Sequence, residues 1–164
     1  MADDPATEPA TGNGNGSDVS VAEARIGISA QYIKDLSFEN PRAPLSVMQN
    51  ESAPHGEVSI QVRNRPLGED NHEIVLDFTV EAKHEGEIAF IVELSYGGVF
   101  TVTGFDDDLK DIALMVECPR ILFPFARRII ADAVQDGGFS PLLLSPVDFL
   151  KLYEHREELA VADA

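Results

Sequence analysis

The sequence predicts an α+β protein in which a four-stranded antiparallel sheet carries helices packed on one face. Residues 26–103 alternate apolar and polar side chains with a period of two, the pattern of strands. The connections between these runs are short, which favours antiparallel pairing. After Gly104 the apolar spacing becomes that of helices. A chain of 164 residues with 44% hydrophobic residues is enough for one domain with a sizeable core.

Each strand is predicted from its alternation and from the turn residues around it. In the first strand Ile28, Ala30 and Tyr32 are expected to share one face, until a phase slip near Lys34 indicates a bulge or bend; a second bulge is expected at Gly97-Gly98. The proline-rich segment 40–56 is a crossover loop with a small apolar group. The four predicted strands cover residues 26–38, 58–63, 74–81 and 87–103.

The helices are predicted from apolar spacing and from proline and glycine signals. The acids 106–108 favour a helix start, and Pro119 should end that first helix. A longer helix should begin near Pro124 and stop at Gly137-Gly138. A proline-bounded apolar loop then leads to a last helix from Pro146.

Composition divides the chain into a domain and two ends. Residues 1–20 are expected to be a disordered acidic tail, residues 21–153 a single domain, and residues 154–164 a flexible C-terminal tail. The formal charge of −17 lies mainly on the domain, which disfavours nucleic acid and anionic lipid as partners and favours basic polypeptide. No secretory signal and no membrane-spanning run is recognisable, so a cytoplasmic protein without membrane insertion is expected.

No pattern of catalytic or metal-binding residues is present. The four histidines are scattered, and Cys118 lies among apolar residues, which indicates a buried thiol. No cofactor motif and no metal site is predicted. Three functions stay open from the residues alone: a groove for extended polypeptide, a small acid–base enzyme that would use Glu93 with Tyr96 or a histidine, and an inert structural oligomer.

Four ordered sequence blocks resemble the SecB family of protein-export chaperones. They run through Ile33–Pro41, Glu93–Phe100, Cys118–Arg127 and Pro141–Phe149, so the resemblance spans about residues 26–153. It implies a cytosolic chaperone, not an enzyme, that holds unfolded secretory precursor proteins and delivers them to SecA. It also implies a homotetramer built as a dimer of dimers. Many family members carry a tryptophan in the crossover loop, whereas this chain contains none.

The resemblance also implies three sets of functional residues. SecA binding falls on an acidic patch of the exposed sheet face, namely Asp35, Glu39, Ile91 and Glu93. A substrate groove is implied between the crossover loop, the second strand and the last helix, with Leu45, Val47, Met48, Val58, Ile60, Val62, Leu142, Leu144 and Phe149 around it. The oligomer interface is implied at the first strand and the long helix, with Ile28, Ala30, Tyr32, Phe125, Ile129 and Ala133.

Overall fold

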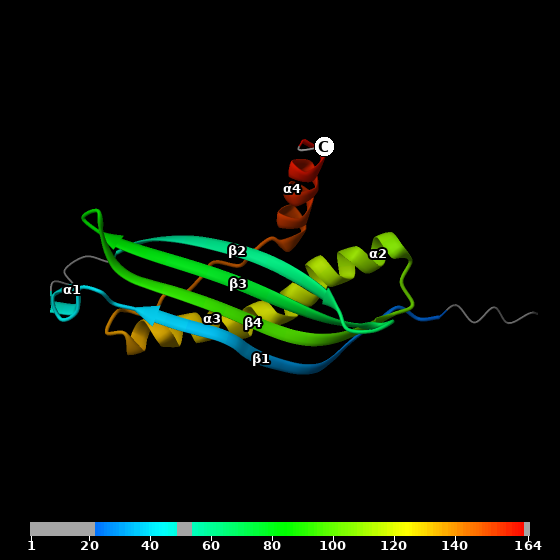
Figure 1. Ribbon diagram of the computed structural model, residues 1–164, viewed down its shortest axis with the longest axis horizontal. Coiled ribbons are helices and arrows are strands. Elements are labelled where there is room, and N and C mark those ends of the chain that lie inside the picture. Colours follow the sequence, from blue (N-terminus) through cyan, green and yellow to red (C-terminus); the bar gives the residue numbers. More distant parts are fainter. Residues whose placement is uncertain (1–21, 49–53, 163–164) are drawn as a thin grey trace, which may run out of the picture.

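The computed structural model describes residues 22–48 and 54–162, and the side chains among these as far as Arg156. Within these residues the fold is α+β, with one four-stranded antiparallel sheet, which confirms the predicted class (Figure 1). The acidic tail predicted for residues 1–20 lies outside the described residues. The elements in chain order are β1 (Arg25–Glu39), α1 (Leu45–Met48), β2 (His55–Pro66), β3 (Asn71–His84), β4 (Glu87–Thr103), α2 (Asp107–Ile112), the π-helical turn η1 (Ala113–Glu117), α3 (Cys118–Asp136) and α4 (Phe149–Ala162).

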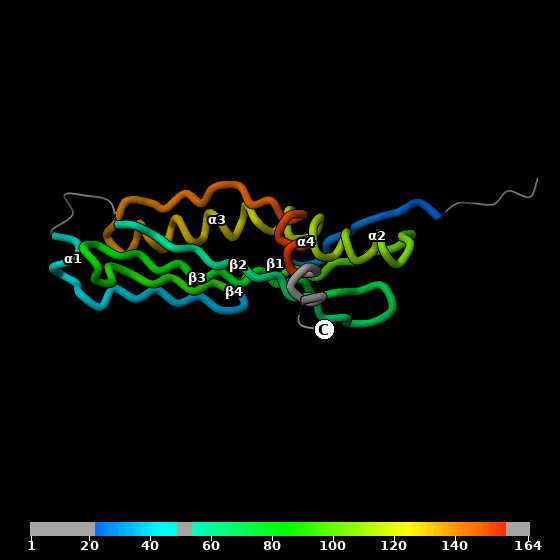
Figure 2. The backbone as a smooth tube through the Cα atoms, turned by 90° about the horizontal axis from the view of Figure 1, so that it is seen from above, coloured from blue at the N-terminus to red at the C-terminus, as the bar shows by residue number. Residues whose placement is uncertain are grey.

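The strands lie in the order β1-β4-β3-β2, so β1 and β2 are the two edges of the sheet. The helix α3 runs along one face, which we call the helix side, as the view along the sheet shows (Figure 2). Alternate residues of β3 and β4 point to that side and build the core together with α3. Phe78 of β3, Phe100 of β4 and Leu122 of α3 are almost fully buried in it. We call the opposite face of the sheet the outer face; no described helix covers it.

Two bulges in β1 change which residues share a face. The register against β4 shifts between Ile28 and Ala30 and again between Ile33 and Asp35. The second shift confirms the predicted phase slip. The first was not predicted, and the expected common face of Ile28, Ala30 and Tyr32 is wrong: Ile28 is on the helix side, whereas Ala30 and Tyr32 are on the outer face.

The bulge predicted at Gly97-Gly98 is absent, because β4 keeps a continuous register with β3 through both glycines. The glycines instead permit close packing on the two faces. A Cβ atom on Gly97 would lie 2.8 Å from the ring of Tyr32, and one on Gly98 would lie 2.8 Å from Leu122 of α3. Both positions therefore lack a side chain because a neighbour occupies its space.

The helical segment after β4 is continuous, so the predicted break at Pro119 is wrong. The turn η1 directly precedes Pro119, and the amide of Cys118 bonds to the carbonyl of Ala113, five residues back. This wider turn takes the backbone out of the regular α-helical ladder where the proline ring would otherwise clash. Pro124 lies inside α3 rather than at its start. The predicted stop at Gly137-Gly138 is confirmed, with Gly138 at a φ of +92°.

The last helix begins three residues later than predicted, at Phe149, and extends to Ala162. It therefore crosses the expected domain limit at residue 153 and includes most of the segment expected to form a flexible tail. Figure 1 shows α4 standing beyond the β2 edge of the sheet rather than lying flat on its face. No described helix is long and apolar enough to cross a membrane.

Candidate functional site: a pocket at the free edge of the sheet

A pocket of about 450 Å³ lies between the free edge of β2 and the helix α4. Four consecutive β2 residues, 60–63, line it, so both faces of the strand edge take part. The apolar part of the lining comes from Ile60, Val62, Met115 and Leu152. A strand edge presents unpaired backbone donors and acceptors, so an extended polypeptide can add main-chain hydrogen bonds there while its side chains enter the pocket.

Two contacts hold α4 opposite the β2 edge, and a cap stabilises its first turn. Phe149 at its start is buried, with its ring 6.0 Å from that of Phe123 in α3. The carboxylate of Asp148 accepts a hydrogen bond of 3.1 Å from the amide of Lys151, which caps the first turn. The hydroxyl of Tyr153 donates to the carboxylate of Asp111 at 2.6 Å. The pocket wall is thus fixed to the core and to the helical segment after β4.

The predicted groove residues fall into three places. Ile60 and Val62 line the pocket, and Val58 continues the same side of β2. Leu45, Val47 and Met48 form α1, which lies at the far end of the sheet from α4; Met48 is 76% exposed (Figure 1). Leu144 and Phe149 are buried in the core, and Leu142 packs against it. Alternation in β2 identifies two pocket residues, whereas Met115, Leu152 and Tyr153 required knowledge of how η1 and α4 pack.

All four predicted SecA-binding residues lie on the outer face of the two adjacent strands β1 and β4. In the register Glu39 is opposite Ile91, and Ser37 is opposite Glu93. Asp35 follows two residues along the same face of β1. Glu39, Glu93 and Asp35 are exposed, and Ile91, opposite Glu39 and two residues from Glu93, is half-buried. The structure thus brings these residues together, while their role remains a prediction.

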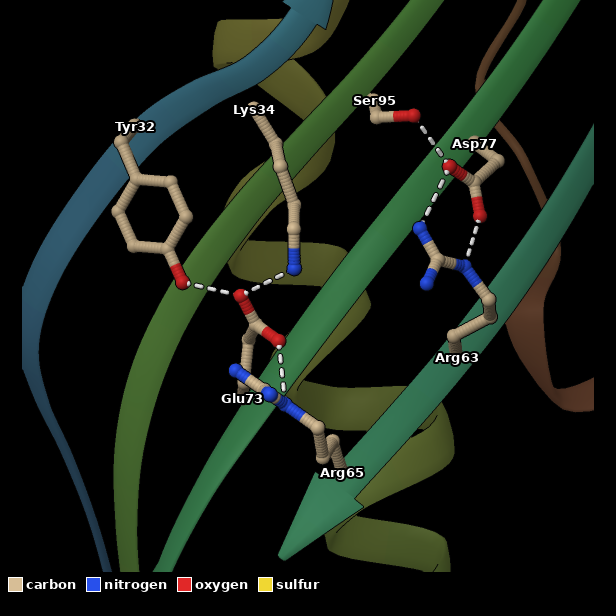
Figure 3. A network of polar contacts seen from close by, with 7 residues as sticks. All are labelled: Tyr32, Lys34, Arg63, Arg65, Glu73, Asp77 and Ser95. Atoms are coloured by element: carbon tan, nitrogen blue, oxygen red, sulfur yellow. Dashed lines mark hydrogen bonds and ion pairs between the residues drawn. The ribbon is translucent and has the colours of Figure 1, made fainter. Parts of the chain in front are cut away.

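A network of ion pairs and hydrogen bonds crosses the outer face beyond this patch (Figure 3). Its centre is Glu73 of β3, whose side chain is 5% exposed. One carboxylate oxygen accepts bonds from the Tyr32 hydroxyl at 2.6 Å and the Lys34 ammonium at 2.8 Å, and the other accepts from Arg65 Nε at 3.0 Å. Beside it, Asp77 accepts from Arg63 and from the Ser95 hydroxyl. The Glu73 centre therefore ties the two edge strands β1 and β2 to β3.

The network shifts the protonation of its members. The hydrogen bonds from Lys34 and Tyr32 lower the pKa of Glu73 to about 2. Burial, together with the hydrogen bond to Glu73, raises the pKa of Tyr32 to about 12. The bond from Arg63 lowers the pKa of Asp77. Lys34 is the bulged residue of β1, and the bulge lets its side chain reach the outer face. The sequence pattern did not single out Glu73.

The residues predicted for an oligomer interface lie on β1 and α3. Ala30 and Tyr32 are on the outer face of the β1 edge, and Ile28 is exposed on the helix side. On α3, Phe125 is 45% exposed and stacks on Tyr96 with ring centroids 6.5 Å apart, while Ile129 packs partly against the core. Ala133 is half-buried. An unpaired edge strand and a partly apolar helix surface thus lie beside each other along one border of the chain.

The structure does not bring together Glu93 and Tyr96, the pair considered above for an acid–base enzyme. Glu93 points to the outer face of β4, whereas Tyr96 is on the helix side, so the two cannot act as an acid–base pair. Cys118 is fully buried, as predicted, and burial raises the pKa of its thiol to about 12. Within residues 22–48 and 54–156, no three acids, histidines or cysteines cluster as they would around a metal ion.

Comparison with known proteins agrees with this architecture. A helix-backed antiparallel sheet of the same fold occurs in the SecB-like chaperone of Mycobacterium tuberculosis, solved in complex with a ChAD peptide from an antitoxin. That structure matches with a TM-score of 0.63 at 12% identity and covers 75% of this chain and 91% of its own. The fold is therefore that of SecB-like chaperones.

Sequence relatives then assign the chain to a family. The protein-export protein SecB of Sinorhizobium medicae is 44% identical over 92% of this chain and 89% of its own length. That of Bartonella quintana is 46% identical over 82% of this chain and 85% of its own. The family described as preprotein translocase subunit SecB matches residues 20–160. The chain belongs to the SecB family, and its function is that of a protein-export chaperone.

Proposed function

We propose that the pocket between β2 and α4 captures unfolded precursor proteins in the cytoplasm and keeps them competent for export. The observation that carries this proposal is the coincidence of an open strand edge with an apolar pocket at the same residues, 60–63. The edge offers sequence-independent hydrogen bonds to the client main chain. The pocket favours burial of apolar side chains, which unfolded proteins expose and folded proteins keep in their cores. The peptide complex of the SecB-like chaperone from M. tuberculosis supports a peptide-binding role for this fold.

The outer-face patch of Asp35, Glu39, Ile91 and Glu93 is proposed to dock SecA. Glu39 and Glu93 flank the apolar side chain of Ile91, and Asp35 extends the acidic row along β1, an arrangement that suits a basic segment with one apolar residue. The patch faces away from the helices, so client and SecA would occupy different surfaces. A client could then stay bound while SecA docks.

The working assembly is proposed to be a homotetramer, a dimer of dimers. Pairing of β1 edges would remove an exposed strand edge, which otherwise favours aggregation. The partly exposed Phe125 and Ile129 of α3 would form the second interface. In this arrangement β2, the opposite edge, remains open to client in every chain.

Replacing Ile60 with asparagine is expected to weaken capture of an unfolded precursor about tenfold. The change removes an apolar side chain from the pocket floor, which corresponds to roughly 1.5 kcal/mol of lost apolar burial. Capture is measured by how strongly the protein slows refolding of a slowly folding precursor. The matched control is Val58→Asn, two residues along the same side of β2 but outside the pocket lining. Equal loss in both variants, or in neither, would contradict the placement of the client.

Replacing Glu93 with lysine is expected to weaken SecA binding about tenfold or more, because the change removes an attraction and adds a like-charge repulsion. Capture of the unfolded precursor should be unchanged, since Glu93 is on the outer face. Isothermal titration calorimetry with SecA checks the first statement, and the refolding assay checks the second. SecA affinity equal to that of the unaltered protein would remove Glu93 from the docking site.

A further inference from the structure

Lys34 lies beside the outer-face patch proposed to dock SecA, but it is not paired with that patch. It is the bulged residue of β1 and directly precedes Asp35, and both side chains lie on the outer face. The ammonium of Lys34 nevertheless bonds to Glu73 of β3 at 2.8 Å, across the intervening strand β4 (Figure 3). Among the side chains that the structure describes, no ion pair involves Asp35, Glu39 or Glu93. The patch therefore keeps its carboxylates unpaired although a cation is adjacent in the chain.

Burial explains why Lys34 pairs with Glu73 rather than with Asp35. A lysine ammonium is carried on a flexible four-carbon stem, so the neighbouring Asp35 is an alternative acceptor. Asp35 is exposed, and an ion pair in water contributes little. The side chain of Glu73 is 5% exposed, and its carboxylate is already oriented by the Tyr32 hydroxyl at 2.6 Å and by Arg65 Nε at 3.0 Å. A fixed carboxylate that is shielded from water attracts the ammonium more strongly.

Release of the Lys34 ammonium would change the charge of the patch. The side chain of Lys34 is 39% exposed, so it is free to turn toward Asp35 once its partner is removed. An ammonium at that position would neutralise one carboxylate and repel a basic segment of the partner. The other cations of the network, Arg63 and Arg65, belong to β2, which β3 separates from the two patch strands β1 and β4. Lys34 is therefore the cation of the network that lies beside the patch.

We propose that Glu73 is a positioning residue for SecA docking, because it sequesters the Lys34 ammonium and so keeps the outer-face patch negative. This inference rests on the proposed SecA patch and deepens it. Glu73 is nearly fully buried and acts through Lys34 rather than by contact with SecA. A neutral side chain at position 73 therefore weakens SecA binding only while Lys34 is present. A purely structural role of Glu73 would instead weaken binding whether Lys34 is present or not.

Two double variants of equal net charge separate these roles. Glu73→Gln alone should weaken SecA binding about three- to fivefold at low salt, as measured by isothermal titration calorimetry with the full-length protein. Adding Lys34→Met should restore the affinity to within about twofold of that of the unaltered protein. Adding Arg65→Gln instead removes the same charge and another partner of Glu73 but leaves the Lys34 ammonium free, so the affinity should stay low. The loss in Glu73→Gln should shrink as salt is added.

Circular dichroism and the refolding assay verify that each variant is folded and still captures precursor. If Glu73→Gln does not fold, the same two double variants are built on Glu73→Asp, which keeps the charge and withdraws the carboxylate from Lys34 by one methylene. Equal SecA affinity of the two double variants, or no loss in the variant of Glu73 alone, would overturn the sequestration of Lys34. The docking patch would still stand if Glu93→Lys weakens SecA binding, whereas unchanged affinity in Glu93→Lys would overturn both proposals.

Discussion

Replacing Glu73 with glutamine is expected to lower the free energy of unfolding by about 2–3 kcal/mol at pH 7. The carboxylate of Glu73 is nearly fully buried on the outer face and accepts bonds from Tyr32, Lys34 and Arg65. A neutral amide removes the charge that compensates Lys34, and its NH₂ group cannot accept a bond. Urea denaturation followed by circular dichroism measures the effect.

The same variant predicts a pH dependence with a definite sign. The folded protein lowers the pKa of Glu73 from 4.5 to about 2, so its contribution to stability is complete above pH 4.5 and is lost as the pH falls toward 2. The difference in unfolding free energy between the unaltered protein and Glu73→Gln should therefore shrink between pH 5 and pH 2. His72, whose pKa is lowered by burial, also destabilises the fold in acid, but its contribution cancels because both proteins contain it.

The control for Glu73 is Glu93→Gln, which removes a carboxylate from the exposed outer face of β4. It should change the unfolding free energy by less than about 0.5 kcal/mol, as is usual for surface substitutions. Similar losses in the two variants, or a constant difference between pH 7 and pH 3, would show that the Glu73 network does not stabilise the sheet.

Replacing Gly97 with alanine is expected to lower the free energy of unfolding by about 1–3 kcal/mol. The added Cβ atom would lie 2.8 Å from the ring of Tyr32, which crosses β4 above this glycine to reach Glu73. The ring must move, and its hydrogen bond to Glu73 is disturbed. Thermal or urea denaturation measures the loss.

Two comparisons separate crowding from a general effect of alanine in a strand. Gly56 of β2 has no atom within 4 Å of an added Cβ atom, so Gly56→Ala should be neutral or stabilise by about 0.4–1 kcal/mol. In a Tyr32→Ala background, Gly97→Ala should lose most of its effect, because the ring is gone. Equal effects of Gly97→Ala with and without the ring would contradict the packing argument.

The sheet could be predicted from the sequence because a period of two determines which side chains reach the core. Strand β4 was predicted with its observed limits, and the phase slip of β1 near Lys34 appeared in the apolar pattern itself. The bulge near Ser29 left no such trace, since Ala30 fits either face. As a result the common face of Ile28, Ala30 and Tyr32 was predicted wrongly.

The helix boundaries and the pocket could be predicted only in part from local sequence patterns. Proline normally ends a helix, but η1 removes the clash before Pro119, and only the three-dimensional packing of that segment reveals it. The outer-face positions of Glu39, Ile91 and Glu93 follow from alternation. The pocket could not be predicted in full, because Met115 of η1 and Leu152 of α4 line it together with Ile60 only through the packing of these two helical segments.

The proposal that unfolded precursor lies at the β2 edge is tested most directly by site-specific crosslinking. The chain has one cysteine, Cys118, and its thiol is fully buried with a pKa raised to about 12, so a maleimide labels an introduced surface cysteine selectively. Val62→Cys places a photoreactive benzophenone in the pocket lining on the helix side of β2, and Thr79→Cys places it on the outer face of β3. Illumination with an unfolded precursor should crosslink it through residue 62 and not through residue 79. Equal crosslinking at both positions, or crosslinking only at residue 79, would contradict the proposed client site.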